Sequence, residues 1–171
     1  MSRILSRLAI LAVASLSFAS VCGCDSINDD RIPYAEVYLN FPTVADWNIH
    51  GVKGDAAAYN IYVKQGNIRI PANFPYTDLD RTGYGGLLLV NDVMGNSLAY
   101  DLSCPVEARP QIRIHVPTGE SYAECSTCGS TYDIYTNHGL PRSGPAADKG
   151  FALQRYSVTS GGALNYKIVT R

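Results

Sequence analysis

The chain lacks several features that would point to a particular class of protein. It has no excess of basic residues, because 14 Lys and Arg stand against 15 Asp and Glu. We therefore expect no nucleic-acid partner. The sequence contains no Gly-x-Ser-x-Gly elbow, no phosphate-binding loop and no zinc protease box. We therefore expect a protein that is not an enzyme.

Long helical and long apolar patterns are also scarce. After residue 23 no segment has the length and period of a convincing helix, and no apolar run is long enough to span a membrane as a helix. In contrast, 15 Gly and 9 Pro are scattered along the chain, and Tyr occurs 12 times. Scattered Gly and Pro residues are typical of many short strands joined by turns, so we expect an all-β fold.

The first residues have the features of an export signal. Two Arg within the first seven residues form a positive segment, and a short apolar run at 8–18 follows it. The pair Gly23-Cys24 resembles a bacterial lipobox, in which the Cys becomes the lipidated first residue. We expect residues 1–23 to be a lipoprotein signal peptide and Cys24 to carry the lipid. An ordinary signal peptide followed by an unmodified Cys is the alternative.

The segment after the expected anchor is polar. We interpret residues 24–33 as a tether, and its Asp29-Asp30 pair resembles the acidic export tags of surface lipoproteins in Bacteroidetes. Residues 34–171 then suit one domain with one sizeable core. We expect a location in the cell envelope, with the protein lipid-anchored to a membrane on the periplasmic face or the outer-membrane surface.

Alternating or apolar runs between turn signals predict the strands. These runs cover residues 35–41, 59–64, 68–70, 86–91, 97–102, 111–116, 131–135, 153–159 and 163–170. Short turn sequences at 66–67, 92–96 and 160–162 indicate hairpins between neighbouring runs. We expect the segments 42–58 and 71–85 to consist mainly of loops.

Three Cys residues remain beyond the expected anchor, namely Cys104, Cys125 and Cys128. An exported chain usually pairs its Cys residues in disulfides. Three is an odd number, so one disulfide would leave a thiol unpaired. The leftover thiol favours a set of ligands over a purely structural role.

Two boxes around these Cys residues carry the most specific motifs. They read Ser103-Cys104-Pro105-Val106-Glu107 and Glu124-Cys125-Ser126-Thr127-Cys128-Gly129-Ser130, followed by Tyr132-Asp133 and later by Gly144-Pro145-Ala146. Their order and spacing resemble a Rieske-type [2Fe–2S] domain, whose boxes read Cys-x-His and Cys-x-x-His-Gly-Ser. The resemblance covers roughly residues 85–171.

The resemblance implies a Rieske-like antiparallel β-sandwich with a small loop-built subdomain for the cluster, at about residues 98–146. It also implies an electron carrier with a redox partner that we cannot name. A Rieske centre holds one iron by two Cys and the other by two His. Here Val106 stands at the first His place and Cys128 at the second. The ligand set is thus degenerate, with Cys104, Cys125 and Cys128 as site residues.

Candidates for a fourth ligand do not occupy the family's positions. Glu107, Glu124 and His115 are nearest in sequence, and each is more often a solvated or hydrogen-bonded residue than a ligand. His50 and His138 lie further from the boxes.

Three outcomes stay open for this site. Cys104 pairs with Cys125 or Cys128 in a disulfide, which makes the chain a non-enzymatic structural or binding lipoprotein without a cofactor. Alternatively, the site holds a [2Fe–2S] cluster with an unusual ligand, which makes the protein an electron carrier. In the third outcome one Zn²⁺ or Fe ion binds to three thiolates and a fourth group.

Overall fold

The computed structural model describes residues 27–52, 57–161 and 165–171. The expected signal peptide and Cys24 lie outside the described residues. Within the described residues, no helix is both long and apolar enough to cross a membrane.

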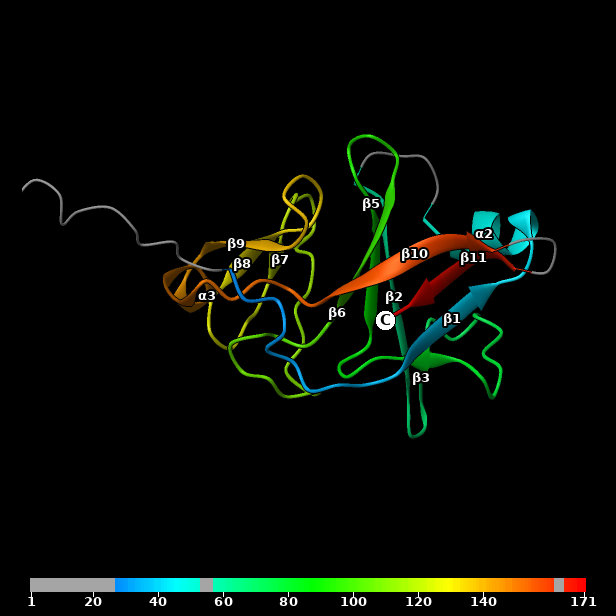
Figure 1. The fold of residues 1–171 in the computed structure, drawn as a ribbon, viewed down its shortest axis with the longest axis horizontal. Helices are drawn as coiled ribbons and strands as arrows, with labels where there is room; N and C mark the ends of the chain where they lie inside the picture. Colours follow the sequence, from blue (N-terminus) through cyan, green and yellow to red (C-terminus); the bar gives the residue numbers. More distant parts are fainter. Residues whose placement is uncertain (1–26, 53–56, 162–164) are drawn as a thin grey trace, which may run out of the picture.

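The fold is all-β, as the sequence predicts, and its strands form two antiparallel sheets (Figure 1). The large sheet contains, in spatial order, β3 (Ile68–Ile70), β2 (Tyr59–Gln65), β5 (Leu87–Asn91), β6 (Ser97–Asp101), β10 (Arg155–Gly161), β11 (Asn165–Thr170), β1 (Val37–Phe41) and β4 (Arg81–Thr82). The small sheet contains β7 (Ala123–Glu124), β8 (Thr131–Asp133) and β9 (Leu140–Ser143). Helix α3 (Pro145–Lys149) lies beside the small sheet, and α2 (Val44–His50) lies at the opposite end of the molecule.

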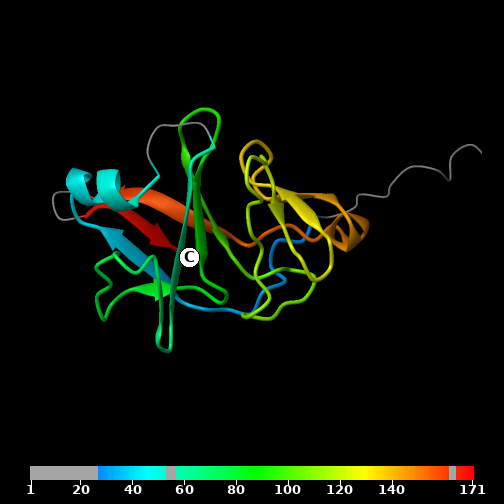
Figure 2. The same cartoon turned by 180° about the vertical axis from the view of Figure 1, so that it is seen from behind.

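The large sheet curls so that its two edges approach each other. The backbone N–H of Lys64 in β2 donates a hydrogen bond of 3.0 Å to Thr82 Oγ1 in β4. The curled sheet and the separate small sheet are visible from both sides of the molecule (Figures 1 and 2). The small sheet, α3 and the loops around them form one lobe, which we call the small lobe.

Strand β5 separates two hydrophobic cores. Its side chains alternate between the two faces of the sheet, as in any strand. Leu87 and Leu89 lie in the core inside the curl, whereas Leu88 and Val90 lie in the core between the curled sheet and the small lobe. A strand that is buried on both faces is expected from a continuous apolar run. The second core also contains Cys104, so the site is part of the packing that joins the two lobes.

The prediction of a strand at residues 111–116 is wrong. This segment makes only single bridges, from Arg113 to Ser103 and from His115 to Glu124. It makes one bridge to Ser103, just after β6, and one to Glu124 in β7, so no ladder forms. The alternation that suggested a strand reflects burial, because Ile114 is 2% exposed in the core shared with the small lobe.

Helix α2 lies in a segment that we expected to consist of loops. A capping box begins it, since the Asp46 N–H donates to Thr43 Oγ1 (3.1 Å) and the Thr43 N–H donates to Asp46 Oδ2 (3.0 Å). Trp47 anchors the helix by packing edge-on against Phe41, with ring centroids 5.0 Å apart. Seven residues are too few for a helical period to be recognised in the sequence.

A candidate three-cysteine metal centre

The structure brings the two Cys boxes together in the small lobe. Cys104 follows β6, Cys125 follows β7, and Cys128 lies in the turn between β7 and β8. The three Sγ atoms lie within 4.8 Å of one another. The Sγ atoms of Cys104 and Cys128 are 3.6 Å apart, and all three residues are free thiols.

The first loop fixes Cys104 through its own backbone. The Cys104 N–H donates to the carbonyl of Ile112 (2.9 Å), and the Ala108 N–H donates to the carbonyl of Cys104 (2.8 Å). The loop therefore closes on both sides of Cys104 and directs its side chain into the core, where it is fully buried.

The second loop is a tight turn that returns Cys128 toward Cys125. The Gly129 N–H donates to the carbonyl of Cys125 (2.8 Å), and the Cys125 N–H donates to the carbonyl of Ser130 (3.0 Å). Gly129 has φ of 69°, in the left-handed region that glycine adopts without strain. The turn places Cys125 in the core and leaves Cys128 half-buried at the edge of the site.

The Gly144-Pro145-Ala146 segment covers the second loop and supports it. The N–H of Ala146 donates a hydrogen bond of 3.0 Å to Ser130 Oγ, which lies 3.2 Å from Cys128 Sγ. Gly144 makes this approach feasible, because a Cβ there would lie 3.0 Å from the carbonyl oxygen of Gly129. The segment thus connects α3 to the thiols through one serine hydroxyl.

The environment affects the thiols in opposite directions. Burial raises the pKa of Cys104 to about 12. Burial also acts to raise the pKa of Cys128, but hydrogen bonds with Ser130 and contacts with the other two thiols outweigh it, so this pKa lies below its ordinary value. Tyr132, whose side chain is buried, places its hydroxyl 3.6 Å from Cys104 Sγ. Cys128 therefore loses its proton more readily than Cys104 does.

Among the described residues, no carboxylate or imidazole joins the three thiols in a metal-ligating group. His115 is exposed, and its Nδ1 lies 3.4 Å from Ser126 Oγ. Val106 packs against the core that contains Cys104 and offers no donor atom. Outside the small lobe, His50 stacks edge-on against Phe74, with ring centroids 5.4 Å apart.

The number of thiols suits one tetrahedral ion better than the two irons of a cluster. Zn–S bonds of about 2.3 Å imply sulfur–sulfur distances of about 3.8 Å in a tetrahedral site. The 3.6 Å between Cys104 Sγ and Cys128 Sγ is close to that value, and all three sulfurs lie within 4.8 Å, a limit about 1 Å above it. A [2Fe–2S] cluster needs four protein ligands, two for each iron. Of the described residues only three thiols are in place, so the site does not fit a complete cluster ligand set.

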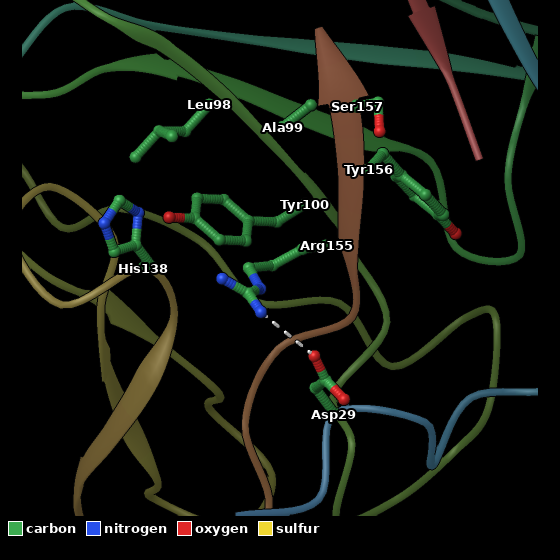
Figure 3. Close-up of a pocket in the computed structure, with 8 residues that line it drawn as sticks. All are labelled: Asp29, Leu98, Ala99, Tyr100, His138, Arg155, Tyr156 and Ser157. Carbon is green, nitrogen blue, oxygen red and sulfur yellow. Dashed lines mark hydrogen bonds and ion pairs between the residues drawn. The ribbon is translucent and has the colours of Figure 1, made fainter.

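A surface hollow of about 480 Å³ lies apart from the thiols (Figure 3). Its lining includes His138, Tyr100 and the ion pair of Arg155 with Asp29, in which Nη2 and Oδ2 are 3.4 Å apart. None of the three Cys residues contributes to this lining. The hollow therefore adds no ligand to the thiol group.

Comparisons with known proteins place the chain in no family. No protein-family model, curated protein or solved structure matches it. The function of the site must therefore be argued from its own geometry.

Proposed function

We propose that the chain is an exported, lipid-anchored, Rieske-like protein in which Cys104, Cys125 and Cys128 bind a single metal ion. The observation that carries the proposal is the convergence of the three Sγ atoms within 4.8 Å. Two boxes about 20 residues apart in the sequence supply these atoms, and both are closed by their own backbone hydrogen bonds. Such a preformed arrangement lowers the cost of ordering the ligands when an ion binds.

Thiolate chemistry restricts the identity of the ion. Soft sulfur ligands select Zn²⁺, Cu⁺ or iron among the common metals, and three ligands with a tetrahedral spacing are best satisfied by Zn²⁺. The fourth position would be filled by water or by a ligand from outside the chain. Each thiol must lose its proton when the ion binds, so binding releases protons and weakens as the pH falls.

An electron carrier is less well supported than a single-ion protein. A [2Fe–2S] cluster would need a fourth ligand, and His115, Glu107 and Glu124 do not join the thiols. Three features around the site support the proposed resemblance to Rieske domains, namely Gly129, Ser130 and the segment starting at Gly144. None of them supplies the fourth ligand.

A disulfide is the second candidate, and one observation favours it. Cys104 Sγ and Cys128 Sγ are 3.6 Å apart, so a small movement of the two side chains would bring them within disulfide-bonding distance. Oxidation would staple the two loops and stabilise the fold by about 2–4 kcal/mol. The chain would then be a structural or binding lipoprotein with a buried thiol at Cys125.

Metal analysis of the full chain tests the proposal. The protein is purified from membranes under anaerobic conditions, and zinc, copper, iron and acid-labile sulfide are measured per chain. We expect one ion per chain and no sulfide, with loss of the ion in Cys125→Ser. Ser126→Ala, an exposed change beside the site, is the matched control and should keep the ion. Metal-free protein with a bond between Cys104 and Cys128 would contradict the proposal and support the disulfide.

A further inference from the structure

The start of the described chain is bound to the small lobe, although its sequence suggested a polar tether. The Asn28 N–H donates to the carbonyl of Gly150 (2.8 Å), and the Ala152 N–H donates to the carbonyl of Asn28 (2.9 Å). Together these bonds form a parallel bridge between Asn28 and Phe151, directly after α3. Ile32 is 2% exposed, so the segment is also held by apolar burial.

Charged side chains of the same segment are paired with the body. Asp29 Oδ2 lies 3.4 Å from Arg155 Nη2, and Asp30 Oδ1 lies 3.1 Å from Arg171 Nη2. Figure 3 shows the first of these pairs between the N-terminal segment and the strand that carries Arg155. Each of these exposed pairs is neutral in sum, so the two acids do not by themselves make this surface negative.

The short distance to Cys24 fixes where an anchor would attach. Asn28 is four positions after Cys24, and a fully extended chain over four positions spans at most about 14 Å. Asn28 lies beside Gly150, at the end of α3, so a lipid on Cys24 would be held close to this end of the molecule. In Figure 1 this is the end opposite α2.

The surface at this end has both basic and apolar side chains. The Arg31 guanidinium lies 4.6 Å and the Lys149 ammonium 5.9 Å from the centre of the Phe151 ring. Ile27 and Leu140 are 48% and 39% exposed, and they line one surface hollow together with polar residues such as Asp29, His138 and Arg155. Exposed cations beside apolar side chains are typical of surfaces that lie in the interface of a bilayer.

We propose that the α3 end of the small lobe lies against anionic phospholipid headgroups of the bilayer that holds the Cys24 lipid. The inference rests on the lipid anchor of the proposed function. Arg31 and Lys149 contact headgroup phosphates, while Ile27 and Leu140 face the interface below them. Asp148 is the exposed acid of α3, and the two cations outweigh it. The three thiols lie in the same lobe, so the metal centre belongs to the membrane-facing half of the molecule.

Energy transfer from tryptophan to lipid tests this orientation. Trp47 is the single Trp of the chain, so Trp47→Phe provides a background without tryptophan. In that background, Ala147→Trp places a probe on exposed α3, and Ile49→Trp places a matched probe on α2, where Ile49 is 69% exposed. Each full-length, acylated protein is inserted into phosphatidylglycerol vesicles that carry a dansyl headgroup lipid. Circular dichroism confirms that each variant is folded.

We expect transfer from the Ala147→Trp probe to exceed transfer from the Ile49→Trp probe severalfold. Arg31→Gln with Lys149→Gln should reduce the α3 signal about twofold, as should vesicles of zwitterionic phosphatidylcholine, because the basic side chains then lose their phosphate contacts. Arg69→Gln with Lys167→Gln, an equal loss of charge elsewhere, should leave the signal unchanged.

Two results would overturn the inference, and they differ in meaning. Equal transfer from both probes in protein that carries an acylated Cys24 would disprove the orientation and leave the anchor intact. An unacylated Cys24, found by mass spectrometry of the N-terminal peptide, would disprove the anchor and the orientation together. Neither result bears on metal binding by the three thiols.

Discussion

The Sγ atoms of Cys104 and Cys128 lie 3.6 Å apart, although the two residues are 24 positions apart in sequence. One follows a strand of the large sheet and the other lies in the turn of the small sheet. Their contact therefore depends on how the loop of the first box packs against the turn of the second box within the small lobe. Changes at the site are expected to affect both ligand binding and the cohesion of the fold.

Ser130 supports the site through Cys128, and Ser130→Ala should weaken metal binding. The variant removes the hydroxyl that lies 3.2 Å from Cys128 Sγ and that accepts from the Ala146 N–H. Groups that hold a metal ligand in place typically contribute 10–100-fold to affinity, so we expect about a tenfold loss. Competition with a chromophoric zinc chelator measures this change. Ser126→Ala should bind as the wild type does, and equal affinity of both variants would argue against a supporting role for Ser130.

The Rieske resemblance predicts how the ligand set can be completed. Val106→His with Cys128→His places two imidazoles at the family's His positions, beside the thiols of Cys104 and Cys125. We expect the double variant to take up iron and sulfide on reconstitution and to show visible absorption. We expect only part of the protein to take up the cluster. The imidazole introduced by Val106→His lies in a half-buried loop and would need a hydrogen-bonding group to orient its ring.

The wild type and the single variant Cys128→His serve as controls for that experiment. Both should take up less iron and sulfide than the double variant, because neither provides two imidazoles. A double variant that is folded but colourless would show that the loops do not have the family's geometry.

The buried carboxylate of Asp101 accepts hydrogen bonds that hold the backbone around the start of the first Cys box in place. Its Oδ1 accepts from the N–H groups of Gly85 (2.9 Å) and Ser103 (2.7 Å), and its Oδ2 accepts from the N–H of Tyr84 and the hydroxyl of Tyr156, both at 2.8 Å. Asp101→Ala leaves these donors buried without a partner and should lower the free energy of unfolding by about 3 kcal/mol or more.

Tyr156→Phe removes only one of those donors and should cost about 1–2 kcal/mol. Urea denaturation measures both variants, with Asp78→Ala at an exposed position as the control. Equal midpoints for Asp101→Ala and Asp78→Ala would contradict the assigned role of the buried carboxylate.

Asp133 should make stability depend on pH in the acid range. Burial acts to raise its pKa, but hydrogen bonds from the Thr136 hydroxyl and from nearby backbone N–H groups outweigh burial and lower the pKa to about 2. The pKa of an unfolded Asp is about 3.9. The carboxylate therefore stabilises the fold above about pH 4, and this contribution disappears as the pH falls toward about 2.

Asp133→Asn removes the titrating group and tests this dependence. The difference in stability between wild type and Asp133→Asn should narrow between about pH 4 and pH 2. Thermal unfolding at several pH values measures it, with Asp78→Asn as the control. A constant difference over this range would show that the Asp133 hydrogen bonds do not depend on ionisation.

Much of the large sheet could be predicted because its strands carry strong local patterns. The apolar run that became β5 and the alternation in β2 are read directly from the sequence, and short turn sequences mark their hairpins. The small sheet was harder to predict. Strand β7 has two residues, and β9 contains Pro141, which reads as a loop residue but is tolerated at the edge of a sheet.

The convergence of Cys104 with Cys125 and Cys128 was expected from the family resemblance rather than from local pattern. The sequence could not provide the distance between the sulfurs, because that distance depends on how the two loops pack against each other. It also did not indicate that Asn28 pairs with Phe151, since a polar segment carries no sign of a single long-range bridge. Contacts of this kind depend on tertiary structure alone.

X-ray absorption at the zinc edge of the anaerobically purified full chain tests the central claim most directly. The account predicts one Zn²⁺ with three sulfur neighbours at about 2.3 Å and one lighter ligand. In Cys125→Ser this pattern should be lost. A two-iron spectrum, or metal-free protein in which Cys104 and Cys128 are joined by a disulfide, would contradict it.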